Sequence, residues 1–235
     1  MKKKVVAAMM SVALVVAVGI GGTLAYLSAQ SEPVTNTFAL GTGYIDDGDH
    51  EGIYLDEEDV DNSSEGTRDT ENEYDNMIPA TSYVKDPLVH MVGGSIESYV
   101  FVYVDGLQEL DAEHIHVYHG TKDNMTQGIN PDLFTPVQVN EYGDGIYLYK
   151  GGLYPVEDAQ YVVDVSDETN GADCQLGKVF DFVMMDGDVS SDDFGRIDLT
   201  GDAITVQAAA VQYAPEQMDS YQDAVNELPA GWFAR

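Results

Sequence analysis

The residues best suited to bind a metal are two histidines separated by one residue. His114 and His116 would share one face of a β-strand, because successive side chains point to opposite faces, and together they could hold a transition metal. No third ligand or general base is identifiable, and the chain lacks a His-Glu-x-x-His motif. Such a pair on a strand is usually just solvated, so the sequence offers a metal site as a candidate and does not indicate an enzyme.

Two acidic segments carry the oxygen ligands that calcium prefers. The first contains Asp46, Asp47 and Asp49, and the second contains Asp186 and Asp188. Neither has the spacing of an EF-hand loop, and acidic turns also occur without bound ions. Calcium is therefore a candidate cofactor of these segments, with diffuse screening by divalent cations as the alternative.

The chain is strongly acidic, with 42 Asp and Glu against 10 Lys and Arg and a formal net charge of −32 at pH 7. Such a surface repels nucleic acid and anionic lipid and favours cations or basic partners. Cys174 is the single cysteine, so no disulfide can form within the chain. Stability must come from packing, metal or partners.

The N-terminus has the order of parts typical of a secretion signal. Lys2, Lys3 and Lys4 precede an apolar run over 5–20, and small residues follow before Ala25. This pattern predicts a signal peptide over 1–25, cleaved between Ala25 and Tyr26. The alternative is a retained N-terminal anchor, so contact with a membrane is expected only through the uncleaved signal.

Short stretches of β-branched and aromatic residues, separated by Gly, Asp and Asn turns, recur after the signal and predict a mainly β fold. The stretch over 98–104 is apolar on both faces, as expected of a central buried strand. A helix should begin at Pro215, with Met218, Tyr221, Val225 and Leu228 on one face, and end at Pro229. Strands are expected over 32–40, 81–89, 98–104, 114–118, 133–139, 145–149, 160–165, 178–184 and 203–213.

Residues 45–78 are acidic and polar, and they predict an insertion loop outside the core. We therefore expect one domain over 26–235: a jelly-roll-like antiparallel β-sandwich with this loop, preceded by the signal helix and closed by the short C-terminal helix.

Two segments near the N-terminus resemble a known family. Gly22-Thr23-Leu24-Ala25-Tyr26 and the downstream Thr35-Asn36-Thr37-Phe38 resemble the SipW-dependent exported proteins of Gram-positive bacteria, the TasA and camelysin-like family of biofilm matrix proteins. Val84-Lys85-Asp86-Pro87 and the C-terminal strand and helix give weaker matches. His90-Met91 departs from the family's Asn-containing turn, and residues 106–200 do not align.

The resemblance implies cleavage by a signal peptidase of the SipW type, a jelly-roll-like fold, and self-association or assembly with related matrix subunits. We expect a secreted structural protein of the cell surface or biofilm matrix. A free segment over 26–33 would lead into a strand carrying Val34, Asn36, Phe38 and Leu40 on one face, which could complete an open sheet edge on a neighbouring subunit. The alternatives are a monomeric exported module that binds a cation or glycan, and a camelysin-like metalloprotease.

Overall fold

The computed structural model describes the main body of the chain and two short strands before it. The backbone is described for 28–31 and 37–40, and whole residues are described for 52–60, 67–70, 72, 74, 77–151, 154–156, 159–189 and 203–233. This part is mainly β, and its strand pairings are all antiparallel, which confirms the predicted class. The predicted signal over 1–25, with Ala25 and Tyr26, lies outside the described residues.

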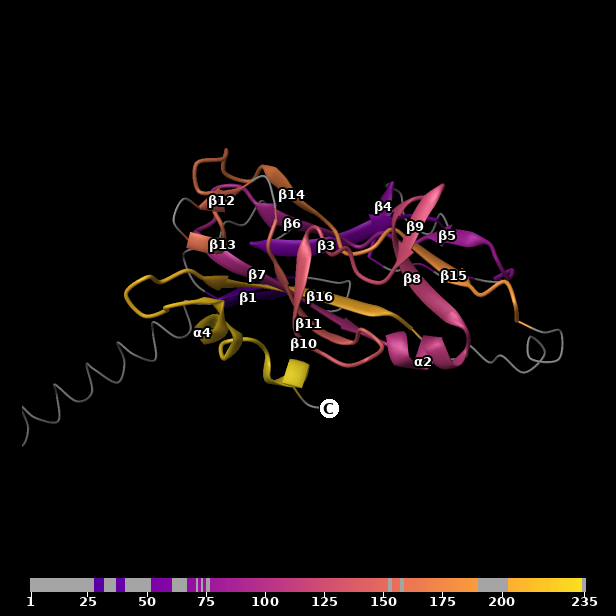
Figure 1. Cartoon of the computed structure of the whole chain (residues 1–235). Helices are drawn as coiled ribbons and strands as arrows, with labels where there is room; N and C mark the ends of the chain where they lie inside the picture. The colour runs from indigo at the N-terminus through magenta and orange to yellow at the C-terminus, as the bar shows by residue number, and fades with distance from the viewer. Residues whose placement is uncertain are drawn as a thin grey trace, which may run out of the picture.

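The largest sheet is built around strand β7 (Ser98–Asp105) (Figure 1). Strand β16 (Thr205–Gln212) pairs with β7 along its whole length. The opposite edge of β7 is shared by β11 (Gly145–Tyr149) and β13 (Ala159–Val163). The sheet is extended by β10 (Phe134–Val139), β12 (Pro155–Val156), β1 (Ser28–Ser31) and β2 (Thr37–Leu40).

Strand β7 is buried on both faces, as its sequence predicts. Val100, Val102 and Val104 face one hydrophobic core, and Tyr99 and Phe101 belong to another. The first core is completed by a second sheet, which lies above β7 and β16 in Figure 1. The second core is covered by the C-terminal segment below the sheet. Packing on both faces explains why this strand is apolar without alternation.

The second sheet has the order β14 (Asp173–Lys178), β6 (Leu88–Val92), β3 (Ile53–Glu58) and β4 (Arg68–Asp69). A third sheet has the order β5 (Ser82–Val84), β15 (Phe182–Met185), β8 (Ile115–Thr121) and β9 (Asn124–Gln127).

Two chain segments pass from the third sheet to the second together. β5 pairs with β15, and β6 pairs with β14, so 82–92 and 173–185 form one antiparallel ribbon that is interrupted near Pro87. Across the interruption the amide of Lys85 donates to the carbonyl of Asp181, and the amide of Val179 donates to the carbonyl of Pro87. The single strands predicted over 81–89 and 178–184 are therefore each divided between two sheets. Proline has no N–H to continue a ladder, which accounts for the break at Pro87.

The prediction of a loop over all of 45–78 is wrong for β3. Ile53 is fully buried and Leu55 is nearly so, and both lie in the first core. The acidic residues of this strand made it look like a solvated loop in the sequence. In the fold their charges are paired, as described below.

The C-terminal segment packs on the large sheet with a shorter helix than predicted. Helix α4 (Tyr221–Val225) begins after Ser220, whose side chain accepts from the amide of Gln222 and which forms a capping box with Asp223. Pro215 lies in a turn before it. The predicted apolar face is nevertheless correct, since Met218, Tyr221, Val225 and Leu228 all pack in the second core. The sequence also did not predict helix α2 (Leu107–Ala112), the 3-10 helix η1 (Ala230–Phe233) or the short strands β4, β9 and β12.

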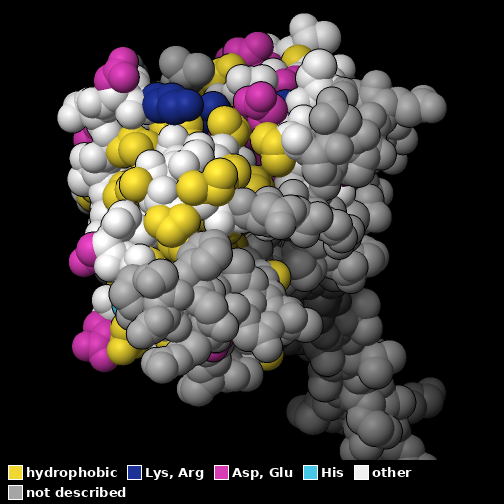
Figure 2. Space-filling model, turned by 90° about the vertical axis from the view of Figure 1, so that its right-hand side faces the viewer, with side chains coloured by type: hydrophobic (Ala, Val, Ile, Leu, Met, Phe, Trp, Pro, Cys, Tyr) yellow, Lys and Arg dark blue, Asp and Glu magenta, His cyan; other side chains and the backbone are white. Residues whose placement is uncertain are grey.

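The end of the molecule that carries β5, β15 and β9 has its own small core. Met77, Leu110, Ile115, Val183 and Met185 are buried there. Figure 2 views this end and shows hydrophobic side chains gathered over the upper left of the face, with acidic side chains along the left and upper margins.

Candidate functional sites

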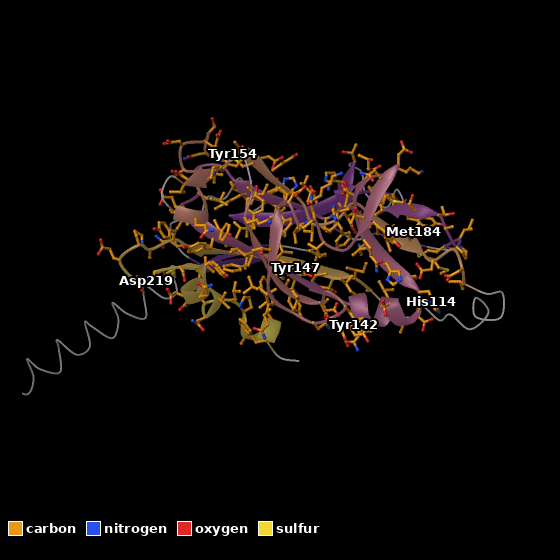
Figure 3. The ribbon with its side chains drawn as sticks, viewed as in Figure 1. His114, Tyr142, Tyr147, Tyr154, Met184 and Asp219 are labelled. Carbon is orange, nitrogen blue, oxygen red and sulfur yellow. The ribbon has the colours of Figure 1, made fainter. Side chains whose placement is uncertain are left out.

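The structure places the two predicted histidines in different settings. His114 is exposed in the turn between α2 and β8, with a positive φ of 61°, and lies at the margin of the molecule (Figure 3). His116 lies within β8, and its side chain is 16% exposed. The strand begins at Ile115, so the prediction that both histidines share one strand face is wrong.

His116 instead lies between two carboxylates. Its Nδ1 is 3.4 Å from an oxygen of Asp111 in α2, and its Nε2 is 3.2 Å from an oxygen of Asp186, which follows β15. The structure therefore joins His116 to Asp186, two residues that the sequence assigned to separate sites. Asp188 is exposed in the turn beyond Asp186. The remaining calcium candidates, Asp46, Asp47 and Asp49, lie outside the described residues.

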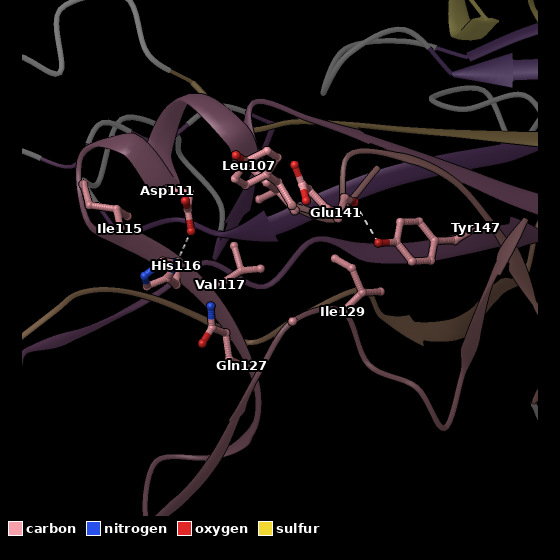
Figure 4. A pocket seen from close by; sticks show the side chains of 12 residues that line it. Leu107, Asp111, Ile115, His116, Val117, Gln127, Ile129, Glu141 and Tyr147 are labelled. Carbon is pink, nitrogen blue, oxygen red and sulfur yellow. Dashed lines mark hydrogen bonds and ion pairs between the residues drawn. The ribbon is translucent and has the colours of Figure 1, made fainter. Parts of the chain in front are cut away.

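A pocket of about 140 Å³ opens beside His116 (Figure 4). It is formed where α2, β8, the turn after β9 and the turn between β10 and β11 meet. Within the part of the chain that the structure describes, no group of three or more His, Cys, Asp or Glu side chains is arranged to hold a metal ion. The pocket is lined by Leu107, Asp111, Ile115, His116, Val117, Gln127, Gly128, Ile129, Glu141, Tyr142, Gly143 and Tyr147.

A second histidine, His90 on β6, lies in a network of charges on the second sheet. Its ring is 2% exposed and stacks on Tyr54 of β3, with the ring centroids 4.4 Å apart. Its Nε2 is 3.0 Å from Asp56 on β3, and its Nδ1 is 2.5 Å from Asp173 on β14. The Tyr54 hydroxyl also donates to Asp173, at 3.1 Å. The pairing of β3 and β14 on either side of β6 brings these residues together.

Opposing influences set the pKa values in this cluster. Burial alone would lower the pKa of His90, but its contacts with Asp56 and Asp173 outweigh burial and raise it above the ordinary 6.5. Burial would raise the pKa of each carboxyl group, but the contacts with His90 lower both below the ordinary 3.8. The arrangement favours a charged imidazolium between two carboxylates.

The network continues through Asp86, a carboxylate that is 1% exposed. Lys178 lies 2.8 Å from Asp86, Arg68 lies 3.4 Å away, and the amide of Glu58 donates to it at 2.7 Å. Arg68 also pairs with Asp56, which links the two halves of the network.

Beside this network, Lys85 pairs with the buried Glu57 at 3.0 Å. Lys85, Arg68 and Lys178 are three of the ten basic residues in the whole chain. Their concentration here gives Asp56, Glu57 and Asp86 the partners that burial requires.

Sequence reasoning missed this network entirely. The alternation Ile53-Tyr54-Leu55-Asp56 was a usable signal for a strand, but the partners of Asp56 and Glu57 are 12 to 34 residues away along the chain. None of the described members of this network is a nucleophile without a partner. The contacts join β3, β6 and β14, and holding these strands together is the role that they support.

The predicted donor segment forms a hairpin at the edge of the large sheet. β1 pairs with β16 through Ser28, Ala29 and Gln30, and β2 pairs with the other side of β1. The sequence predicted one strand over 32–40 preceded by an unpaired segment over 26–33, and the first strand therefore begins earlier than expected. Phe38 and Leu40 lie in β2, whereas Val34 and Asn36 lie outside the described residues.

Comparison of the chain with models of protein families, with curated proteins and with solved structures found no match. Among the described residues, no helix has both the length and the apolar character that crossing a bilayer requires.

Proposed function

We propose that this chain is a secreted structural protein of the surface or biofilm matrix of a Gram-positive bacterium. The signal-like pattern over 1–25 supports export after cleavage between Ala25 and Tyr26 by a signal peptidase of the SipW type. In this proposal the mature domain is a jelly-roll-like β-sandwich that follows a signal helix, and the uncleaved signal is its only contact with a membrane. The resemblance at 22–26 and 35–38 supports the same assignment.

The observation that carries the proposal is the position of β1. The proposed cleavage leaves Tyr26 as the first residue, and β1 begins two residues later, at Ser28. In the structure this strand adds to the large sheet by pairing with Ala209, Ala210 and Val211 of β16, and β2 then forms the edge. The segment that completes the sheet is therefore the one that cleavage would release.

Such a hairpin can complete the same edge in a second copy of the chain. An exchange in which each copy donates to the next does not close on itself, so it produces a filament. While the signal is attached, its tether would restrict the donation. The partner in this mechanism is another copy or a related matrix subunit, and dissolved cations such as calcium would screen the repulsion between acidic copies.

The experiment that tests this function measures the size of purified protein that begins at Tyr26, by light scattering and electron microscopy. We expect filaments or large oligomers that excess peptide covering 26–41 shortens. A stable monomer that ignores the peptide would contradict the proposal and favour a monomeric binding module.

A backbone variant makes the test specific to β1. Because β1 lies between β16 and β2, an N–H in this strand has a ladder acceptor on one side or the other. Ala29→Pro removes one ladder hydrogen bond and should abolish assembly, whereas Ala29→Ser keeps the N–H and should assemble like the parent chain. Equal assembly of both variants would count against exchange through β1.

Export is tested separately from assembly. Mass spectrometry of the culture medium should find a mature chain that begins at Tyr26. Retention of residues 1–25 on the exported protein would exclude release of the hairpin by cleavage.

A further inference from the structure

The pocket beside His116 has a composition that selects a particular kind of ligand. Its lining contains two carboxylates, Asp111 and Glu141, and neither Lys nor Arg. Four aliphatic side chains form much of the remaining wall: Leu107, Ile115, Val117 and Ile129. A ligand that fits both parts has a positive charge at one end and an apolar stem.

The two carboxylates differ in their existing partners. Asp111 already lies 3.4 Å from the ring of His116, and Asp186 lies on the other side of that ring. Glu141 is exposed and makes no hydrogen bond or ion pair with any described residue. Figure 4 shows both carboxyl groups beside the hollow, from α2 and from the turn between β10 and β11. Glu141 is thus available to pair with a cation, and Asp111 adds a second negative charge nearby.

The aromatic side of the pocket is fixed and neutral. The Tyr147 hydroxyl donates to the carbonyl of Gly143 at 2.7 Å, which holds its ring at the wall. Burial, with the nearby charge of Asp144 as a smaller cause, raises the pKa of Tyr147 to about 12. The phenol therefore remains protonated at neutral pH. Its ring, with that of the partly exposed Tyr142, is of the kind that attracts an ammonium group.

We propose that this pocket binds an aliphatic primary ammonium group, with the ammonium at Glu141 and Asp111 and the methylene chain along Val117 and Ile129. Divalent metal ions fit less well, because the carboxylates of Asp111 and Asp186 lie at different nitrogens of the His116 ring and do not converge. This inference is independent of the filament proposal, since β1 and β16 do not contribute to the pocket.

The ammonium could belong to a free amine or to a lysine side chain, and the probes separate these sources. Binding of 1,5-diaminopentane and of N-acetyl-lysine methylamide would be followed through the methyl resonances of Val117 and Ile129 in the Ala29→Pro variant, which should not assemble. Both probes should shift these resonances saturably, whereas 1-pentanol, which lacks the charge, should bind at least tenfold more weakly. Tighter binding of the lysine derivative would assign the site to a protein partner, and tighter binding of the diamine would assign it to a free amine.

Because the whole surface is acidic, the decisive control removes a charge elsewhere. Glu141→Gln should weaken binding of the responding probe at least fivefold, and Asp111→Asn should weaken it by a similar factor. Glu216→Gln makes the same change at an exposed turn before α4 and should leave binding unchanged. Equal effects of Glu141→Gln and Glu216→Gln, or pentanol binding as tightly as the amines, would overturn the proposal.

Discussion

Replacement of His90 by glutamine should destabilise the fold in a manner that depends on pH. The substitution removes a charge that contacts both Asp56 and Asp173 and also removes the ring that stacks on Tyr54. Breaking one partner of a buried ion pair costs about 3–5 kcal/mol. The cost here should lie at or just below the lower limit, about 2–3 kcal/mol, because the Asp173 side chain is 45% exposed and Asp56 keeps Arg68.

The pKa directions fix the pH range in which this difference is largest. The pKa of His90 is raised in the folded state, so its contribution is complete below about 6.5 and is lost as the pH rises through the folded value. The pKa values of Asp56 and Asp173 are lowered, so the same contacts are present above about 3.8 and are lost as the pH falls through the folded values. The difference in unfolding free energy should be greatest between these limits.

Urea denaturation of the parent chain and His90→Gln at pH 3, 5.5 and 9 measures this difference. We expect a loss of about 2–3 kcal/mol at pH 5.5 and a smaller loss at both extremes. His119→Gln provides the matched control, because His119 on β8 has no ion-pair partner among the described residues. A loss for His90→Gln that is constant from pH 3 to 9, or below about 0.5 kcal/mol throughout, would refute the assignment of a charged imidazolium in this network.

Three further substitutions, the last with a matched control, test the packing. Phe101→Ala should lower the unfolding free energy by about 3–5 kcal/mol in urea denaturation, because the ring is fully buried in the second core, and a loss below about 1 kcal/mol would contradict that position. Tyr103→Ala removes the ring that stacks on Trp232, the single tryptophan, so fluorescence emission should move to longer wavelength, and unchanged emission would contradict the docking of η1. Gly106→Ala should cost about 2–3 kcal/mol in thermal denaturation, because φ is 97° and a Cβ would lie 2.1 Å from the carbonyl oxygen of Ala203. Gly128→Ala, also at positive φ but with open space around it, should cost only about 1 kcal/mol, and equal losses would show that the clash at Gly106 is unimportant.

Strands whose surroundings are apolar were predicted well from the sequence. The range 145–149 agrees with β11, and 98–104 differs from β7 by one residue, because burial on both sides makes these stretches hydrophobic throughout. The C-terminal apolar face was also correct, although α4 begins only after the cap at Ser220 and spans five residues.

The errors arose where residues distant in the chain determine the structure. β3 appeared to be an acidic loop because Asp56 and Glu57 find their cations on other segments. The break at Pro87 depends on a ribbon partner nearly a hundred residues later, and local pattern does not indicate that two sheets meet there. The sequence named His116 as a candidate ligand, but its contacts with Asp111 and Asp186 come from α2, which was not predicted, and from the end of β15.

Exchange of the N-terminal hairpin is tested most directly by cross-linking between copies. Ala29 and Ala210 are register partners in β1 and β16, a separation that a disulfide can span. Ala29→Cys and Ala210→Cys are made separately, each with Cys174→Ala, in chains that begin at Tyr26, and the two proteins are mixed and oxidised. We predict a disulfide-linked pair containing one chain of each kind. If the mixture remains monomeric while the double variant forms the bond within one chain, the hairpin completes only its own sheet, and the proposed assembly is wrong.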